Sequence, residues 1–186
     1  MFKGWSAYHL SLVAVFAAIL LFAGLNALWM RTSGGYDISA EATLPYGTDQ
    51  LWQWTIENDK RKKWQVGMYD LSSLHGAPSE IDSARMLFFI GGEKKWNGVE
   101  VTLESTKPSK WVARQEMPKA IRIYRVTLGA ISRCHTIVRL REESELFDFT
   151  ERFWLFWNKS DHQERLNYSL RQLKTWMGHK GETCEE

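Results

Sequence analysis

Towards its carboxyl end the chain carries the sequence LNYSLRQLKTWMG, residues 166–178, which indicates how the domain is closed. Apolar side chains recur in it at intervals of three and four residues: Leu166, Leu170, Leu173 and Met177. Polar side chains fill the other side of a helical projection: Arg165, Arg171, Gln172 and Lys174. This pattern is typical of an amphipathic helix with one buried face. We expect the helix to run over residues 160–177 and to end at Gly178.

Before this helix, the sequence shows only the features of strands. Six short runs rich in β-branched and aromatic residues occupy 66–74, 84–90, 96–104, 111–117, 121–128 and 134–141. Turn-forming segments such as Gly76-Ala77-Pro78, Gly91-Gly92 and Lys107-Pro108-Ser109 separate them. No helical interval of about 10–15 residues lies between the runs, which argues against a parallel βαβ sheet. We therefore predict an antiparallel meander of six strands.

The region ahead of the meander predicts one more strand and a short helix. Residues 38–44 alternate between apolar and polar side chains, as in a strand with one solvated face. Thr48 is suited to cap a helix that runs to Glu57, and a polar segment, 58–65, follows it. Residues 147–157 carry six aromatic side chains. They fit either a final strand that leads into a turn or an early helical segment, and both interpretations stay open.

This order of elements resembles that of the START-like (SRPBCC) superfamily, which includes polyketide cyclase/dehydrase-like, coenzyme Q-binding and Bet v 1-like lipid-binding proteins. The resemblance is carried by the opening strand with Pro45, Leu51-Trp52, 59–64, Tyr124-Arg125-Val126-Thr127 and 166–174. It covers about residues 36–177, and its motifs are structural rather than catalytic. It implies an α+β helix-grip fold, in which an antiparallel sheet wraps around the long carboxy-terminal helix and the space between them is often a cavity.

Residues 10–30 form an apolar segment without a charged side chain. At about 1.5 Å per residue, a helix of this length crosses a hydrocarbon core of about 30 Å. The length of the run and the bulky Leu28-Trp29-Met30 favour an uncleaved anchor over a cleaved signal peptide. A core helix is the third alternative, but a helix that is apolar on every side needs protein all around it. Trp5, Tyr8 and Trp29 bracket the run as interfacial aromatic residues would.

The predicted organisation has four parts. They are a transmembrane anchor at 1–31, a linker at 32–35, a START-like domain at 36–178 and a polar tail at 179–186. Lys3 on one side of the anchor nearly balances Arg31 on the other, so charge favours neither orientation strongly. We slightly favour the domain on the extracytoplasmic side. Cys134, within a predicted strand, and Cys184, in the tail, show no evident structural partner and do not identify the compartment.

Composition and motifs exclude several function classes. The net charge of +2 arises from 24 basic and 22 acidic residues that are mixed along the chain, so no basic stripe is available for nucleic acid. The sequence contains no Gly-x-Ser-x-Gly, Gly-x-Gly-x-x-Gly, phosphate-binding Gly-Lys-Ser/Thr or Cys-x-x-Cys motif. Its five histidines lack the spacing of metal ligands. The catalytic residues, if the protein is an enzyme, stay unknown, and we predict no metal site and no cofactor.

Aromatic side chains are the main candidates for ligand binding, because the chain has ten tryptophans. In the cavity that the resemblance implies, the candidates are Trp54, Trp64, Tyr69, Phe88, Trp96, Trp111, Tyr124, Trp154, Trp157 and Trp176. For each of them, an ordinary place in the core is the alternative.

Four polar residues on predicted strands are secondary candidates: Arg114, Arg122, Tyr124 and Arg125. An arginine that points inward would need an anionic or carbonyl partner, such as a ligand head group. One that points outward would pair across the sheet with Glu104 or Glu116.

The most concentrated basic segment is Lys60, Arg61, Lys62 and Lys63, beside Trp64. It is a candidate for contact with an anionic membrane surface, where each charge contributes about 1 kcal/mol. An ordinary solvated helical turn is the alternative.

The leading hypothesis is a single-pass, membrane-anchored START-like domain that binds a hydrophobic ligand, such as a lipid, a quinone or an isoprenoid, in an aromatic-lined cavity. Its expected partners are the membrane, that small molecule and, in one alternative, a membrane protein. The two alternatives are an enzyme similar to polyketide cyclases or dehydrases, and a ligand-free interaction module for an envelope or membrane protein.

Overall fold

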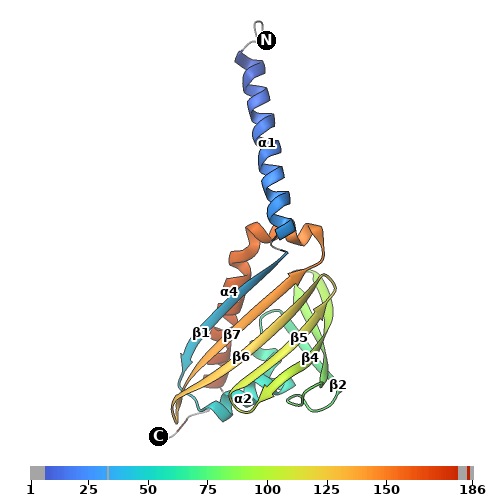
Figure 1. Cartoon of the computed structure of the whole chain (residues 1–186). Coiled ribbons are helices and arrows are strands. Elements are labelled where there is room, and N and C mark those ends of the chain that lie inside the picture. The colour runs from blue at the N-terminus through green and yellow to red at the C-terminus, as the bar shows by residue number, and fades with distance from the viewer. Residues whose placement is uncertain (1–6, 33, 180–183, 185–186) are drawn as a thin grey trace. The chain divides into compact units, whose positions relative to one another are not determined.

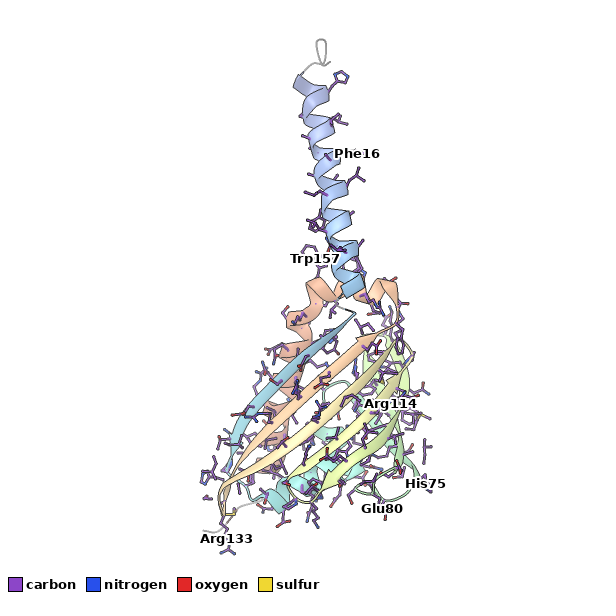
Figure 2. The ribbon with its side chains drawn as sticks, viewed as in Figure 1. Phe16, His75, Glu80, Arg114, Arg133 and Trp157 are labelled. Carbon is purple, nitrogen blue, oxygen red and sulfur yellow. A yellow bond between two sulfur atoms is a disulfide. The ribbon has the colours of Figure 1, made fainter. Side chains whose placement is uncertain are left out.

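The computed structural model describes residues 7–32, 34–179 and 184. The chain divides into two compact units, Met1–Gly34 and Gly35–Glu186. The first unit consists of one helix, α1 (Ala7–Thr32). Its segment Ser11–Leu28 is long and apolar enough to cross a membrane, and none of it is buried in protein. Figure 2 shows Phe16 standing out from this helix.

By length and composition the helix α1 fits a transmembrane anchor, and a signal sequence meets the same criteria. Lys3, Trp5 and Ser33 lie outside the described residues.

The second unit contains a seven-stranded sheet and three helices in its described residues (Figure 1). The strands are β1 (Gly35–Leu44), β2 (Met68–His75), β3 (Ala84–Gly91), β4 (Lys94–Thr106), β5 (Lys110–Met117), β6 (Ala120–Ser132) and β7 (His135–Leu146). The helices are α2 (Thr48–Ile56), α3 (Asn58–Trp64) and α4 (Phe149–His179).

The sheet has the strand order β1-β7-β6-β5-β4-β3-β2, and all neighbouring strands are antiparallel. The six-strand meander is therefore confirmed, and the opening strand joins it at the free edge of β7. In Figure 1, α4 lies along one face of the sheet, which we call the inner face. It packs against β1, β7 and α3, while α2 contacts β6. This is the helix-grip fold that the order of elements predicts.

The apolar periodicity of α4 is confirmed. Leu166, Leu170, Leu173 and Met177 are all buried. Their counterparts on the inner face of the sheet include Leu44, Val126, Val138 and Leu140, which are also buried. Burial of side chains of this size contributes about 1.5–3 kcal/mol each. This apolar layer holds the helix against the sheet.

The prediction for the length of α4 was wrong at both ends. The helix begins at Phe149 because the Asp148 carboxylate accepts hydrogen bonds from the backbone N–H groups of Thr150, at 2.8 Å, and Glu151, at 3.1 Å. The aromatic segment 147–157 is thus mostly helical, which decides between the two open interpretations. At the other end the helix continues through Gly178 to His179. The polar segment 58–65 is also helical, as α3.

A disulfide joins Cys134, in the β6–β7 turn, to Cys184 in the tail. The expectation that neither cysteine has a structural partner was therefore wrong. The start of β7 and the end of α4 both lie near Tyr46. The Thr136 hydroxyl donates to the Tyr46 carbonyl at 2.8 Å, and Gly178 lies near the Tyr46 hydroxyl. This pairing joins positions 50 residues apart, so local sequence carries no sign of it. Figure 2 shows the neighbouring Arg133 at this end of the domain.

Candidate functional site: a polar belt inside the domain

A row of polar side chains crosses the inner face of the sheet where an apolar lining is expected. We call it the polar belt, and its members are Tyr36, Ser144, Arg122, Gln115, Glu100 and Arg85. Each residue is the direct cross-strand partner of the next, from β1 through β7, β6, β5 and β4 to β3. All but Arg122 are buried, and the Arg122 side chain is 16% exposed. The helices contribute Arg61 from α3 and Arg165 from α4.

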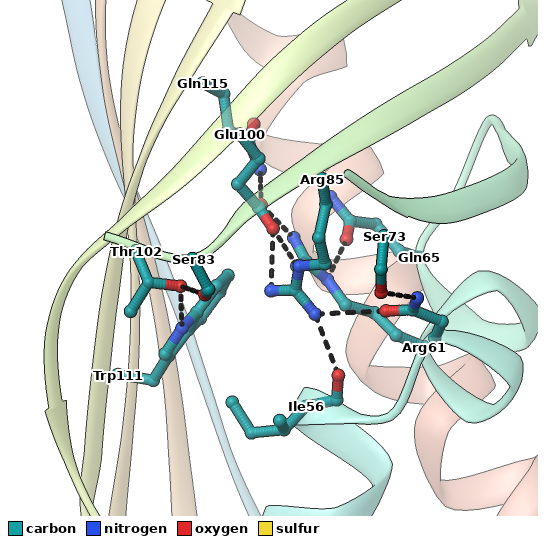
Figure 3. A network of polar contacts seen from close by, with 11 residues as sticks. Ile56, Arg61, Gln65, Ser73, Ser83, Arg85, Glu100, Thr102, Trp111 and Gln115 are labelled. Carbon is teal, nitrogen blue, oxygen red and sulfur yellow. Dashed lines mark hydrogen bonds and ion pairs between the residues drawn. The ribbon is translucent and has the colours of Figure 1, made fainter. Parts of the chain in front are cut away.

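Glu100 is the centre of the first cluster in the belt (Figure 3). Arg61 donates from Nη1 to Oε1 and from Nη2 to Oε2, both at 2.7 Å, in a bidentate pair. Arg85 Nη2 lies 2.7 Å from Oε1, and Gln115 Nε2 donates to Oε2 at 2.7 Å. Two guanidinium groups therefore share one carboxylate.

Trp111 supports both arginines of this cluster. The guanidinium carbon of Arg61 lies 4.6 Å from the centre of the indole ring, and that of Arg85 lies 5.1 Å from it. The indole N–H donates to the Thr102 hydroxyl at 3.2 Å, which fixes the ring (Figure 3). Arg85 is also held by the Ile56 carbonyl at 2.8 Å.

The charge of Glu100 is stabilised by its neighbours. Burial by itself raises the pKa of the carboxyl group, but the guanidinium groups of Arg61 and Arg85 outweigh it and hold the pKa at about 2. For Arg85, burial lowers the pKa to about 10, which still leaves the side chain charged at neutral pH. The cluster therefore carries one negative and two positive charges.

Glu142 forms the second cluster, and it precedes the belt residue Ser144 by two positions on the same face of β7. The Tyr36 hydroxyl donates to Oε1 at 2.5 Å, and Arg165 Nη2 donates to the two carboxylate oxygens at 2.7 and 2.8 Å. Arg122 Nε lies 3.6 Å from Oε1, within ion-pair range but beyond a hydrogen bond. His162 stacks on Tyr36 with ring centres 4.5 Å apart.

These groups also keep their ordinary charges. For Glu142, burial raises the pKa, but Arg122 and Arg165 outweigh it and hold the pKa at about 2. Burial raises the pKa of Tyr36 to about 12 and lowers the pKa of His162, so both are neutral at pH 7. Burial opposes the charge of Arg165, but Glu142 outweighs it and raises the pKa of that side chain.

The belt gathers the buried polar atoms that lack a hydrogen-bond partner. Within the described residues these atoms are Arg85 Nη2, Gln115 Oε1, Arg122 Nε, Tyr124 Oη and Ser144 Oγ. Arg85 Nη2 has its ion pair with Glu100 but not the geometry of a hydrogen bond. Four of the five belong to the belt, and Tyr124 lies two residues from Arg122 on the same face of β6. Each unpaired buried polar group costs about 1–3 kcal/mol.

The aromatic candidates divide into three groups. Four are fully buried between the sheet and the helices: Trp54, Trp64, Trp111 and Tyr124. The Arg61 guanidinium group lies 4.6 Å from the centre of the Trp111 ring and 5.6 Å from that of the Tyr124 ring. Phe88 is half-buried and packs against Tyr69 at 6.0 Å. The remaining five are exposed: Tyr69, Trp96, Trp154, Trp157 and Trp176. The structure thus brings four of the ten together in the interior.

The prediction that Arg61 of the basic segment lies on the surface was wrong. Arg61 is not a surface residue, because its side chain is 0% exposed and paired with Glu100. Arg61 lies three residues before the buried Trp64 on α3, so both share the buried face of the helix. Lys60 and Lys62 instead form ion pairs with Glu57, at 3.1 Å, and Asp59, at 3.0 Å. The Lys63 ammonium lies 5.8 Å from the centre of the Trp176 ring.

The strand candidates divide in the same way. Arg122 and Tyr124 point inward. Arg114 is on the surface and pairs with Glu116 at 3.0 Å, but along β5 and not across the sheet as predicted, and Arg125 pairs with Glu143. Arg85, Glu100, Gln115 and Glu142 were not predicted as site residues, and Arg165 was predicted on the polar face of its helix, whereas it pairs with the buried Glu142. The alternation of side chains along the strands could have indicated two of them. Arg85 lies on the same face of its strand as the buried Leu87 and Phe89, and Glu142 lies on the same face as the buried Leu140.

Two hollows lie on the surface of the described part of the chain. One is on the side of α1. The other, of about 350 Å³, lies between β1 and α4 and is lined by Glu41, Ala42, Thr43, Leu44, Asn167, Leu170, Arg171 and Lys174. Neither includes a member of the polar belt.

The fold is shared with several solved structures, although no family model and no curated protein sequence matches the chain. A protein of Thermus thermophilus is similar, with a TM-score of 0.66 and 12% identity over 79% of this chain and 100% of its own. The ginseng major latex-like protein 151 of Panax ginseng has a TM-score of 0.57 and 7% identity over 77% and 97%.

The di-domain ARO/CYC StfQ from the steffimycin biosynthetic pathway has a TM-score of 0.61 and 10% identity over 79% of this chain and 52% of its own. At these identities the likeness shows the helix-grip fold alone.

Proposed function

We propose that this chain is a membrane-anchored START-like domain that binds an amphipathic hydrophobic ligand between the sheet and α4, with the polar end of the ligand at the polar belt. The observation that carries the proposal is the gathering of buried polar atoms without partners in one layer of the interior. Such atoms are costly unless something pairs with them. The layer lies between the sheet and α4, where the START-like resemblance implies a cavity.

The apolar part of the ligand has a matching surface. Met68, Leu71, Leu87 and Phe89 form a buried cluster with Met117 packed against it. Leu87 follows Arg85, and Met117 follows Gln115, by two residues on the same face of their strands. Methionine side chains adapt to new neighbours, so Met68 and Met117 are suited to move aside for an acyl or isoprenoid chain.

The charge states favour binding over acid–base catalysis. A general acid or base works best with a pKa near the working pH. The pKa values of Glu100 and Glu142 move away from neutrality, to about 2, and that of Tyr36 moves away to about 12. These groups hold fixed charges and dipoles, which suits recognition of a head group. A cyclase-like reaction is therefore the weaker proposal.

We further propose that α1 is the anchor and that the domain lies on the oxidising side of the membrane. The apolar length of α1 supports the first part. The disulfide between Cys134 and Cys184 supports the second, because disulfides persist outside reducing compartments. This agrees with the slight preference drawn from the flanking charges.

The test is native mass spectrometry of the full chain, purified in a nonionic detergent and then offered a total lipid extract. We expect one bound amphiphile per chain. Met117→Trp, which places a larger side chain beside the belt, should abolish binding, whereas the matched control Leu103→Trp, on an exposed position of β4, should not. Circular dichroism checks that both variants fold. A wild-type chain that stays empty would contradict the proposal and favour the ligand-free interaction module.

A further inference from the structure

We infer that the ligand carries an oxyanion, a carboxylate or phosphate on an apolar chain, and that Arg122 receives it. The inference rests on the proposed function and names the ligand class. Its basis is the charge balance of the two clusters. The described interior contains four guanidinium groups, Arg61, Arg85, Arg122 and Arg165, against two carboxylates, Glu100 and Glu142. Two positive charges are unbalanced in a medium where charge is costly.

Contacts within the clusters show which arginine is available. Arg61 and Arg165 each make two close contacts to a carboxylate. Arg85 has its ion pair with Glu100 and also bonds to the Ile56 carbonyl and to Asn58 Oδ1, at 3.3 Å. Each of these three arginines thus has a carboxylate oxygen at 2.7 Å, although Arg85 Nη2 lacks the geometry of a hydrogen bond.

Arg122 is different. The contact between its Nε and Glu142, at 3.6 Å, is too long for a hydrogen bond, and Nε is buried without a hydrogen-bond partner. Among the four interior arginines of the described chain, it is the one whose charge is least satisfied. Its 16% exposed side chain leaves a route for an incoming group.

Two neutral donors stand beside Arg122. Ser144 is its direct cross-strand partner on β7, and Tyr124 lies two residues along β6 on the same face. The Ser144 and Tyr124 hydroxyl groups are both buried without a hydrogen-bond partner. Together with the guanidinium group they provide donors from two strands for one oxyanion. Gln115 is the cross-strand partner of Arg122 on β5, and its Oε1 is also buried without a hydrogen-bond partner. Because this oxygen is an acceptor, it does not contribute to holding an anion.

The experiment compares ligands with the same chain and different head groups. The full chain in a nonionic detergent at pH 8 is mixed with radiolabelled oleate or oleyl alcohol, and bound label is measured after gel filtration. Dioleoyl phosphatidic acid and dioleoylglycerol form a second pair, which distinguishes a free carboxylate from a phospholipid head group. We expect wild type to bind one anionic ligand at least about 10-fold more tightly than its neutral counterpart, the effect of one charge-assisted hydrogen bond.

Three variants test the role of Arg122. Arg122→Gln should reduce the preference to about 1-fold, and Arg122→Lys should retain most of it. Arg125→Gln is the matched control on the same strand, because its side chain pairs with Glu143 outside the interior, and it should behave as wild type. Tyr124→Phe changes no charge and should weaken only the anionic ligand, so it decides the matter if Arg122→Gln does not fold.

The outcomes separate the two proposals. If neither the anionic nor the neutral ligands bind, the proposed function itself fails. If both members of each pair bind equally to wild type, the domain binds hydrophobic ligands but the oxyanion inference is wrong. The same conclusion follows if Arg122→Gln and Tyr124→Phe both fold and keep the anionic preference.

Discussion

Replacing Glu100 by Gln should destabilise the domain by about 3 kcal/mol at pH 7. The pKa of this carboxyl group is about 2 in the folded protein, against an ordinary value of 4.5. At about 1.36 kcal/mol for each pH unit of difference, the charged form gains about 3 kcal/mol on folding. A separate argument gives a similar size, because removing one partner of a buried ion pair costs about 3–5 kcal/mol.

The pH dependence has a definite sign. Since folding lowers the pKa of Glu100, its contribution is complete above the unfolded value near 4.5 and is lost as the pH falls towards 2. The difference between wild type and Glu100→Gln should therefore be largest at neutral pH. It should fall to less than half by about pH 3, where the wild-type carboxyl group begins to protonate in the folded state.

The assay is urea unfolding of the full chain in nonionic detergent micelles, followed by tryptophan fluorescence at pH 7, 5 and 3. Glu104→Gln is the control on the same strand. Its carboxylate pairs with Lys110 at 2.8 Å on the surface, so its loss should cost less than about 1 kcal/mol. A cost below about 1 kcal/mol for Glu100→Gln, or a cost that does not change between pH 7 and pH 3, would refute the reasoning.

Three further predictions concern stability and use the same unfolding assay. Tyr36→Phe removes a buried hydrogen bond to a charged group and should cost about 1.5–3 kcal/mol; no measurable loss would mean that this bond contributes nothing net. Cys134→Ser should cost up to about 4 kcal/mol, because the bond to Cys184 closes a long loop, and a reducing agent should have the same effect on wild type but none on the variant. Trp111→Ala should cost about 3–5 kcal/mol and the exposed Trp176→Ala less than about 1; equal costs would contradict the burial described.

The fold was largely predictable because its elements carry strong periodic patterns. Alternation over residues 38–44 identified β1, and the intervals between Leu166 and Met177 identified the buried face of α4. Turn-forming residues separated the strands of the meander. Boundaries were less predictable, since they depend on single hydrogen bonds such as the capping of α4 by Asp148.

The interior of the site was much less predictable. A charged residue in a sequence usually indicates a position on the surface. Arg61 stands among three lysines that do lie on or near the surface. Its burial depends on Glu100, which comes 39 residues later and on another element. The same holds for Arg165 and Glu142, and for the two cysteines. These partners are brought together only by the order of strands in the folded sheet.

The polar belt also has a consequence for the assembly of the sheet. Side chains on a strand alternate between its two faces, so a shift of one residue would move every inward residue outward. A slip of β4 by one position would place Glu100 in solvent and leave Arg61 and Arg85 facing Val99 or Val101 without a counter-charge. A slip of two positions keeps each side chain on its own face, so an apolar inner face would tolerate it more readily, whereas the polar belt would still lose its ion pairs. The buried charges therefore make misaligned strands costly from β1 to β3, and they select a single alignment of the sheet.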